Sequence, residues 1–192
     1  GDRKGDRRAD GKQRAAEDDA GQQEAANADF DGRLHAGGHC AVDLAAEIAG
    51  GKTGVRDQKY RLTCDIDMSK LSDGKVQQPI GLRKSTANWF IGEFDGCGYT
   101  VSNVNITATS ETAVGFFGVI GGGAVRNLTV EGEIKGPSVT TGDVCVGGIA
   151  GKIVNTPTIE NCTSKCTLSG GSGTSYYIGG IVGHSNGSAA VI

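Results

Sequence analysis

Val125-Arg-Asn-Leu-Thr-Val130 has two close counterparts elsewhere in the chain, Val101-Ser-Asn-Val-Asn-Ile106 and Ile159-Glu-Asn-Cys-Thr-Ser164. Asparagine stands third in each copy, and the second interval between asparagines is longer than the first. Units as short as these cannot cover their own apolar face, so equivalent units stack and their strands pair about 4.8 Å apart. The pattern predicts a parallel β-solenoid in which Asn103, Asn127 and Asn161 form one column of bonded amides. The residues after each asparagine are expected to fill the interior: Val104, Leu128 and Cys162.

A second series of glycine-bracketed apolar pairs alternates with the first. It recurs at nearly equal intervals and comprises Gly115-Phe-Phe-Gly118, Gly148-Ile-Ala-Gly151 and Gly180-Ile-Val-Gly183. In Val146-Gly-Gly-Ile149 the apolar residues are three apart, which puts them on opposite faces of a straight strand. We therefore expect a corner at the two glycines that returns both side chains to the interior, with glycine supplying any positive φ that the corner needs.

The composition excludes several classes of partner. The 192 residues suit one or two domains, and the formal net charge of −3 offers no basic surface for nucleic acid or an anionic membrane. The 33 glycines follow no Gly-X-Y period, which excludes collagen and favours a β architecture rich in turns. No apolar run reaches the roughly 20 residues of a membrane span. The chain starts without Met and stops within a repeat, so we interpret it as a fragment of a longer protein.

The chain divides into three regions. Residues 1–32 are expected to be a disordered, low-complexity charged segment, because they contain too few apolar residues to offset the entropy of ordering. Residues 33–55 contain Cys40 to Ala49, whose apolar residues recur with helical spacing and end at Gly50-Gly51, so we expect a short helix that caps the solenoid. Residues 56–192 are expected to form the solenoid itself.

Further segments stand beside the two later glycine brackets: Asp43-Leu44, Gly50-Gly51, Tyr60 to Asp67, Pro79-Ile-Gly81, Phe90 to Thr100 and Val101 to Ile106. Taken together, these segments resemble the GLUG motif and the region that commonly precedes it. The GLUG motif is a repeat of bacterial surface proteins that also occurs in the non-catalytic region of immunoglobulin-A-cleaving metallopeptidases. The resemblance covers roughly residues 34–192 and implies an all-β, right-handed parallel β-helix with an N-terminal capping helix, in an extracellular or cell-surface protein. Two positions depart from the pattern: Cys97 stands where asparagine is usual, and Gly115-Phe-Phe-Gly118 lacks a second leading glycine.

Several polar groups invite a functional interpretation, and each has a simpler structural one. Asp65 and Asp67 lie two apart, as calcium ligands of some β-helix lyases do, yet the resemblance places them in a structural signature of the first coil. Glu93 and Asp95 form a similar pair, and Asp95 can bond the backbone amides of its own turn. The remaining candidates have no partner residues in the sequence that would complete a site. They are a metal site at His35, His39 and Cys40 and a catalytic role for His184. Trp89 and Phe90 could form a platform for sugar binding, for which packing on the first coil is the alternative.

The cysteines and the glycosylation sequons support no firm assignment. Cys162 and Cys166 are too far apart along one strand for a disulfide, and we expect the cysteines to act mainly as small apolar residues, with three disulfides as the alternative in a secreted protein. The six cysteines are Cys40, Cys64, Cys97, Cys145, Cys162 and Cys166. Sequons start at Asn105, Asn127, Asn161 and Asn186, of which Asn127 and Asn161 belong to the expected column, where a glycan would not fit.

We therefore predict a structural repeat module of a secreted or cell-surface protein that serves adhesion or display. We assign it no catalytic residue, no metal ligand and no cofactor. Its expected partners are host or surface glycans or proteins, and further β-helix coils on its C-terminal side. The alternatives are a carbohydrate-active enzyme on the same scaffold, which needs acids and a base converging from successive coils, and a non-catalytic spacer of a large surface peptidase.

Overall fold

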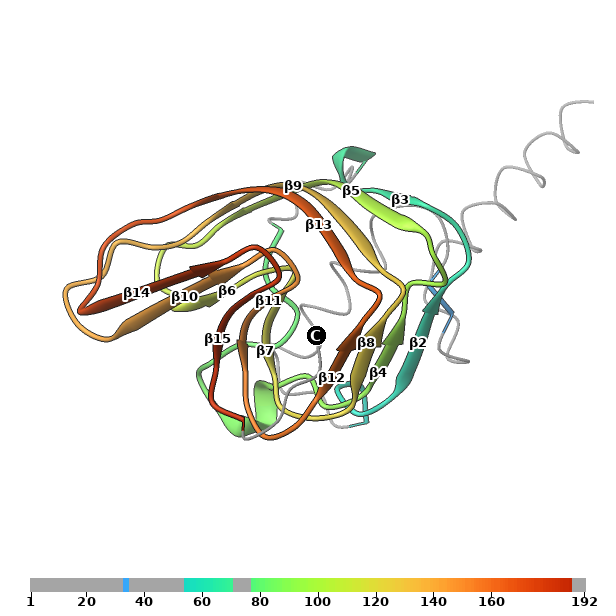
Figure 1. The fold of residues 1–192 in the computed structure, drawn as a ribbon, viewed down its shortest axis with the longest axis horizontal. Helices are drawn as coiled ribbons and strands as arrows, with labels where there is room; N and C mark the ends of the chain where they lie inside the picture. The colour runs from blue at the N-terminus through green and yellow to red at the C-terminus, as the bar shows by residue number, and fades with distance from the viewer. Residues whose placement is uncertain (1–32, 35–53, 71–76, 188–192) are drawn as a thin grey trace, which may run out of the picture.

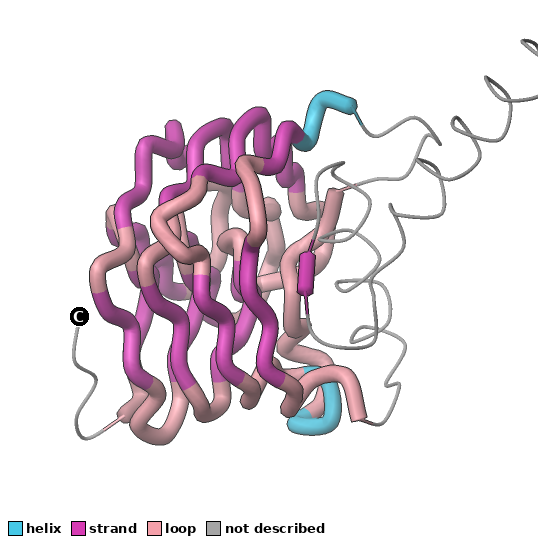
Figure 2. Tube along the Cα trace, turned by 90° about the vertical axis from the view of Figure 1, so that its right-hand side faces the viewer, coloured by secondary structure: helices cyan, strands magenta, loops and turns pink. Residues whose placement is uncertain are grey.

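A computed structural model describes residues 33–34, 54–70 and 77–187, and within them the chain forms a parallel β-solenoid of about four turns. Every pair of neighbouring strands is parallel, and most coils contribute one strand to each of four sheets. Figure 1 looks along the solenoid, and Figure 2 shows the coils from the side. The chain runs anticlockwise from β12 through β13 and β14 to β15 in the coil nearest the viewer of Figure 1, so the solenoid is right-handed. The predicted fold class is confirmed.

The first two sheets meet at a corner and form two adjacent sides of the solenoid (Figure 1). The five-stranded sheet comprises, in order, β1 (Arg33–Leu34), β2 (Lys59–Leu62), β4 (Glu93–Asp95), β8 (Ala124–Arg126) and β12 (Thr158–Glu160). The four-stranded sheet comprises β3 (Ile66–Asp67), β5 (Thr100–Thr107), β9 (Thr129–Lys135) and β13 (Thr163–Ser169). Two short 3-10 helices, η1 (Met68–Lys70) and η2 (Thr86–Asn88), lie in the connections.

The remaining two sheets have three strands each and lie on the other side of the solenoid. The first comprises β6 (Ala113–Val114), β10 (Asp143–Gly147) and β14 (Ser175–Gly179). The second comprises β7 (Phe117–Ile120), β11 (Ala150–Ile153) and β15 (Val182–Ser185). These two sheets meet at a re-entrant angle (Figure 1).

The core runs along the solenoid axis and is built from inward-facing columns of apolar residues. Its N-terminal half holds aromatic rings in contact: Phe117 has its ring centroid 5.1 Å from that of Phe90 and 5.4 Å from that of Phe94. Leu128 and Val104 are fully buried, as predicted, and Cys162 packs against the core while partly buried. Alternation of buried and open positions along β5 and β9 is the period-two pattern of a sheet with one solvated face.

The glycine brackets lie where the two three-stranded sheets meet. Gly118 and Gly183 stack on either side of Gly151, and Val146 and Ile149 are both buried, so the predicted corner is present. The expected reason was wrong, because none of these glycines has a positive φ. A Cβ on Gly183 would lie 2.6 Å from the backbone nitrogen of Val146, and one on Gly151 would overlap that of Val114. Glycine is needed because the two sheets approach backbone to backbone.

The first bracket has a corner of different length. Val114 pairs with Val146, which places Gly115 beside Gly147 and not beside Gly148. Phe117 pairs with Ala150, so this coil turns the corner with one residue fewer. The missing second glycine is therefore a deletion at the corner, and the strands on both sides remain in register.

Two predicted regions lie outside the described residues. They are the charged segment 1–32 and the capping helix expected at Cys40 to Ala49 within residues 33–55.

Candidate functional site

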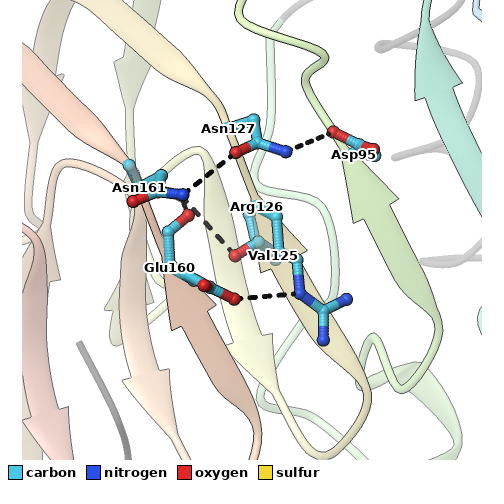
Figure 3. A network of polar contacts seen from close by, with 7 residues as sticks. Asp95, Val125, Arg126, Asn127, Glu160 and Asn161 are labelled. Carbon is cyan, nitrogen blue, oxygen red and sulfur yellow. Dashed lines mark hydrogen bonds and ion pairs between the residues drawn. The ribbon is translucent and has the colours of Figure 1, made fainter.

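The asparagines that define the repeat stand at a corner between the five-stranded and the four-stranded sheet. Asn127 and Asn161 follow β8 and β12, and both have a left-handed backbone, with φ values of 54° and 51°. Asparagine adopts this conformation more readily than other non-glycine residues because its short polar side chain bonds locally. The side chain of Asn161 donates from Nδ2 to Oδ1 of Asn127 at 3.3 Å (Figure 3).

The column continues to an aspartate. Asn127 donates from Nδ2 to Oδ1 of Asp95 at 3.0 Å (Figure 3). The same oxygen accepts the backbone N–H of Cys97 at 2.8 Å. These bonds hold the pKa of Asp95 below its ordinary value, with the Asn127 amide as the main cause and the Cys97 amide as the second. Cys97, which stands where the GLUG pattern usually has asparagine, also has a left-handed backbone, with a φ of 51°, but it lies one residue beyond Gly96, the register neighbour of Asn127.

Asn103 does not belong to this column, which corrects the prediction of three stacked asparagines. It lies within β5 at a register shift between Val101 and Val104, and its Nδ2 donates to Oδ1 of Asp67 at 2.7 Å. Phe94-Asp-Gly96 is the segment that pairs with Val125-Arg-Asn127. The sequence contained the signal, because the interval from Asn103 to Asn127 is clearly shorter than the full coil that separates Asn127 from Asn161.

Asp67 and Asp65 both bond groups of the neighbouring coil. Asp67 Oδ1 accepts from Ser69 Oγ at 2.7 Å, from Asn103 and from the backbone N–H of Ser69. These bonds, the Ser69 hydroxyl first, lower the pKa of Asp67 from its ordinary 3.8 to about 2. Asp65 Oδ1 accepts the backbone N–H of Thr100 at 2.8 Å. The two carboxylates therefore hold β5 against the coil before it, which is the structural interpretation of the pair.

Charged residues on the outer face of the solenoid pair between coils. Arg126 Nε lies 3.3 Å from Glu160 Oε2, Lys165 Nζ lies 2.6 Å from Glu131 Oε1, and Lys59 Nζ lies 3.4 Å from Glu93 Oε1. Each pair joins register neighbours on parallel strands. Because the pairs are exposed, each contributes at most about 1 kcal/mol to stability.

The other candidate residues are dispersed. Phe90 is fully buried in the core, which rules it out as a sugar platform, and Trp89 packs beside Gly121, where a Cβ would lie 2.8 Å from its ring. His184, the candidate for a catalytic role, lies within β15 with its ring 4.6 Å from that of Tyr177. His35, His39 and Cys40 lie outside the described residues. Within residues 54–70 and 77–187, no three His, Cys, Asp or Glu side chains come together to hold a metal ion.

The five cysteines that the structure describes all have free thiols. Burial raises the pKa of the thiols of Cys145, Cys162 and Cys166. The thiol of Cys97 is partly exposed and accepts a long contact of 3.8 Å from Arg61 Nη2. Cys145, which is fully buried, fits the expected role of a small apolar residue.

The described residues contain no helix that could span a membrane. Of the sequon asparagines, Asn127 uses its amide nitrogen within the corner column, whereas Asn105 is exposed on β5.

Comparison with known proteins supports the repeat assignment. Residues 142–169 match the GLUG motif, so the chain contains at least one such repeat. Halomucin of Haloquadratum walsbyi is 34% identical over 134 residues, which are 67% of this chain and 1% of that protein. A putative Gly-rich membrane protein of Evansella cellulosilytica is 39% identical over 77 residues, which are 38% of this chain and 9% of that protein. The chain thus spans a small part of the relatives that it matches. No solved structure matches it significantly.

Proposed function

We propose that this chain is a structural module of a cell-surface or secreted protein, that it serves display or adhesion, and that it carries out no catalysis of its own. The observation that carries the proposal is the corner column, in which Asn161, Asn127 and Asp95 bond one another across three coils. The polar residues that recur with the repeat therefore hold coils together. Asp65, Asp67 and Asp95 likewise accept hydrogen bonds from the next coil.

The names of the two relatives support a place at the cell surface. One is called halomucin and the other a putative Gly-rich membrane protein. The solenoid also suits display, because stacked coils give a stiff rod whose outer face is independent of its core.

Surface location is tested on intact cells of the source organism with antibodies raised against the folded module. We expect labelling of unpermeabilised cells, and loss of the labelling after brief protease treatment of the same cells. A cytosolic protein serves as the control for cell integrity. Labelling that requires lysis would contradict the surface assignment.

The absence of catalysis is tested against a panel of neutral and acidic polysaccharides, with and without calcium. We expect no new reducing ends and no unsaturated products, and binding to at least one immobilised glycan or surface protein. Release of oligosaccharides that Asp67→Asn abolishes would favour the carbohydrate-active enzyme instead.

The last described coil also offers a partner surface, and we propose that it receives a further coil of the same type. Val114, Val146 and Ile178 form one inward-facing column; the first two are fully buried, whereas Ile178 is 52% exposed. Tyr176, Ile181 and Val182 likewise pack on the core while only partly buried. An additional coil in register would bury this column and pair the open strand edges.

A further inference from the structure

The re-entrant angle between the β6–β10–β14 and β7–β11–β15 sheets contains two columns of side chains that face away from the core. Strand alternation places them there, since the residues next to them in sequence, Val114 and Val146 on the first sheet and Ile120 and Ile153 on the second, belong to the core. The column on the first sheet comprises Ala113, Cys145 and Tyr177. The column on the second comprises Leu82, Val119, Lys152 and His184, with Leu82 carried by the segment that pairs with β7 through Ile80.

The N-terminal part of this angle is closed by apolar contact. Leu82, Ala113, Val119 and Cys145 are each at most 5% exposed although they lie outside the main core. The two outward faces therefore press together in the earlier coils, and they form a small second core.

The character of the angle changes in its last two coils. Tyr177 is 37% exposed, and its ring meets that of His184 edge to face at 4.6 Å, which holds both rings in place. Lys152 stands next to His184 in the same column. In these coils the outward-facing side chains are therefore two aromatic rings and an ammonium group in place of the small apolar residues of the earlier coils.

The charge near this surface is mainly positive. Lys152 and Arg83 both lie close enough to Cys145 to act on its thiol, as does the carboxylate of Asp143. Arg83 donates to the hydroxyl of Thr112 at 3.1 Å and to the backbone oxygen of Asp143 at 2.8 Å. Among the residues that the structure describes, neither Lys152 nor Arg83 is paired with a carboxylate.

We propose that Tyr177, His184 and Lys152 form a binding site for a uronic acid unit of an acidic polysaccharide. The C–H face of a pyranose ring packs on an aromatic side chain, and the carboxylate of the same sugar reaches the ammonium of Lys152. A preorganised ring pair lowers the entropic cost of binding. The proposal rests on the proposed adhesive function and names the class of ligand for it.

Tetragalacturonic acid is the probe, with cellotetraose as the neutral comparison and tetraglutamate as the acidic peptide comparison. Calorimetric titration of the whole chain is expected to show tetragalacturonic acid binding about tenfold more tightly than either, which corresponds to about 1.4 kcal/mol. Raising the salt concentration should weaken this binding, because the Lys152 contact is partly exposed.

Matched variants measure separately how much the Tyr177 ring and the Lys152 charge contribute to binding. We expect Tyr177→Ala to weaken binding about tenfold, Tyr177→Phe to retain it, and Lys152→Gln to remove the preference for the charged sugar. Tyr99→Ala is the control for an aromatic residue of nearly equal exposure, at 36%, and Lys165→Gln is the control for charge; neither should change the affinity. The unfolding midpoint of each variant confirms that it is folded, and Lys152→Gln decides the matter should Tyr177→Ala not fold.

Three outcomes would overturn the proposal. They are no binding of tetragalacturonic acid by the unaltered chain, equal binding by Tyr177→Ala or Lys152→Gln, and tighter binding of tetraglutamate, which would indicate an acidic peptide as the partner. None of these results bears on the cell-labelling experiment, so a failure here is distinguishable from a failure of the surface assignment.

Discussion

Asn127 combines two roles that are separable by substitution. Its backbone is left-handed, a conformation that is unfavourable for a residue that has a Cβ atom but no side-chain group to form a local hydrogen bond. Its side-chain amide bonds the coil before it and the coil after it. We expect Asn127→Ala to lower the free energy of unfolding by about 2–3 kcal/mol, as the sum of backbone strain and lost hydrogen bonds. Asn127→Gly should cost only about 1 kcal/mol, because glycine accepts the backbone conformation. Urea unfolding measures both values.

Asn105 provides the control for this pair. It is exposed on β5, outside the corner column, so Asn105→Ala should change the stability by less than about 0.5 kcal/mol. Equal losses for Asn127→Ala and Asn127→Gly would show that the left-handed conformation does not explain the recurrence of asparagine.

Asp67 makes the stability of the module depend on pH in the acidic range. Its pKa is about 2 in the folded protein against an ordinary 3.8, so the folded state favours the carboxylate. This contribution is complete above pH 4 and is lost as the pH falls from about 4 to about 2. We expect Asp67→Asn to show a smaller fall of the unfolding midpoint between pH 5 and pH 2.5 than the unaltered chain, because an amide does not titrate there.

Glu133→Gln is the matched control, since Glu133 is an exposed carboxylate on β9. It should leave the acid dependence unchanged. A proton titration followed by NMR at the Asp67 carboxyl checks the cause directly, and a midpoint near 4 would contradict it.

The sequence predicted the solenoid at the residue scale but misplaced one residue. Asn127 and Asn161 are one full coil apart, as are the register partners Arg126 and Glu160 beside them, so their stacking followed from spacing alone. Asn103 shares the local pattern because the same left-handed conformation recurs at a bulge, and a local pattern does not reveal which coil position it serves. Asp95 took the place expected for Asn103 because a carboxylate accepts the same bond.

At the scale of the elements, the glycine brackets determine how closely two sheets approach. A Cβ on Gly151 would overlap the backbone of Val114, whereas one on Gly180 would meet nothing within 4 Å. We expect Gly151→Ala to destabilise the protein by about 2 kcal/mol or more, because the sheets must separate and the buried Ala113 and Cys145 lose contact. Thermal unfolding gives the comparison with Gly180→Ala, which should be nearly neutral.

Gly151 ends one bracket and Gly180 begins the next, and both lie at the corner, so a similar effect at both would mean that glycine serves the corner conformation after all. The sequence could predict the corner, since apolar residues three apart require it. It could not predict the close approach of the sheets, because that depends on pairing between segments that lie a whole coil apart in the chain. For the same reason the facing columns of Tyr177 and His184 had no signal in the sequence.

At the scale of the whole molecule, the stacked coils make stability a sum over neighbours. Inserting a second copy of residues 154–185 after Ser185 reproduces the junction between Ile153 and Val154, because Ser185 is the register partner of Ile153. The inserted coil should cover Ile178, which is 52% exposed, and pair with the open edges of β14 and β15. We expect a higher urea midpoint, a larger m value in proportion to the added buried surface, and slower hydrogen exchange at the Ile178 amide.

The control insertion carries Ile178→Asp and Val182→Asp within the copy, which places charges in the inward columns and should abolish all three changes. An insertion that left the Ile178 amide exchanging at its original rate would show that the end of the last coil does not accept another coil.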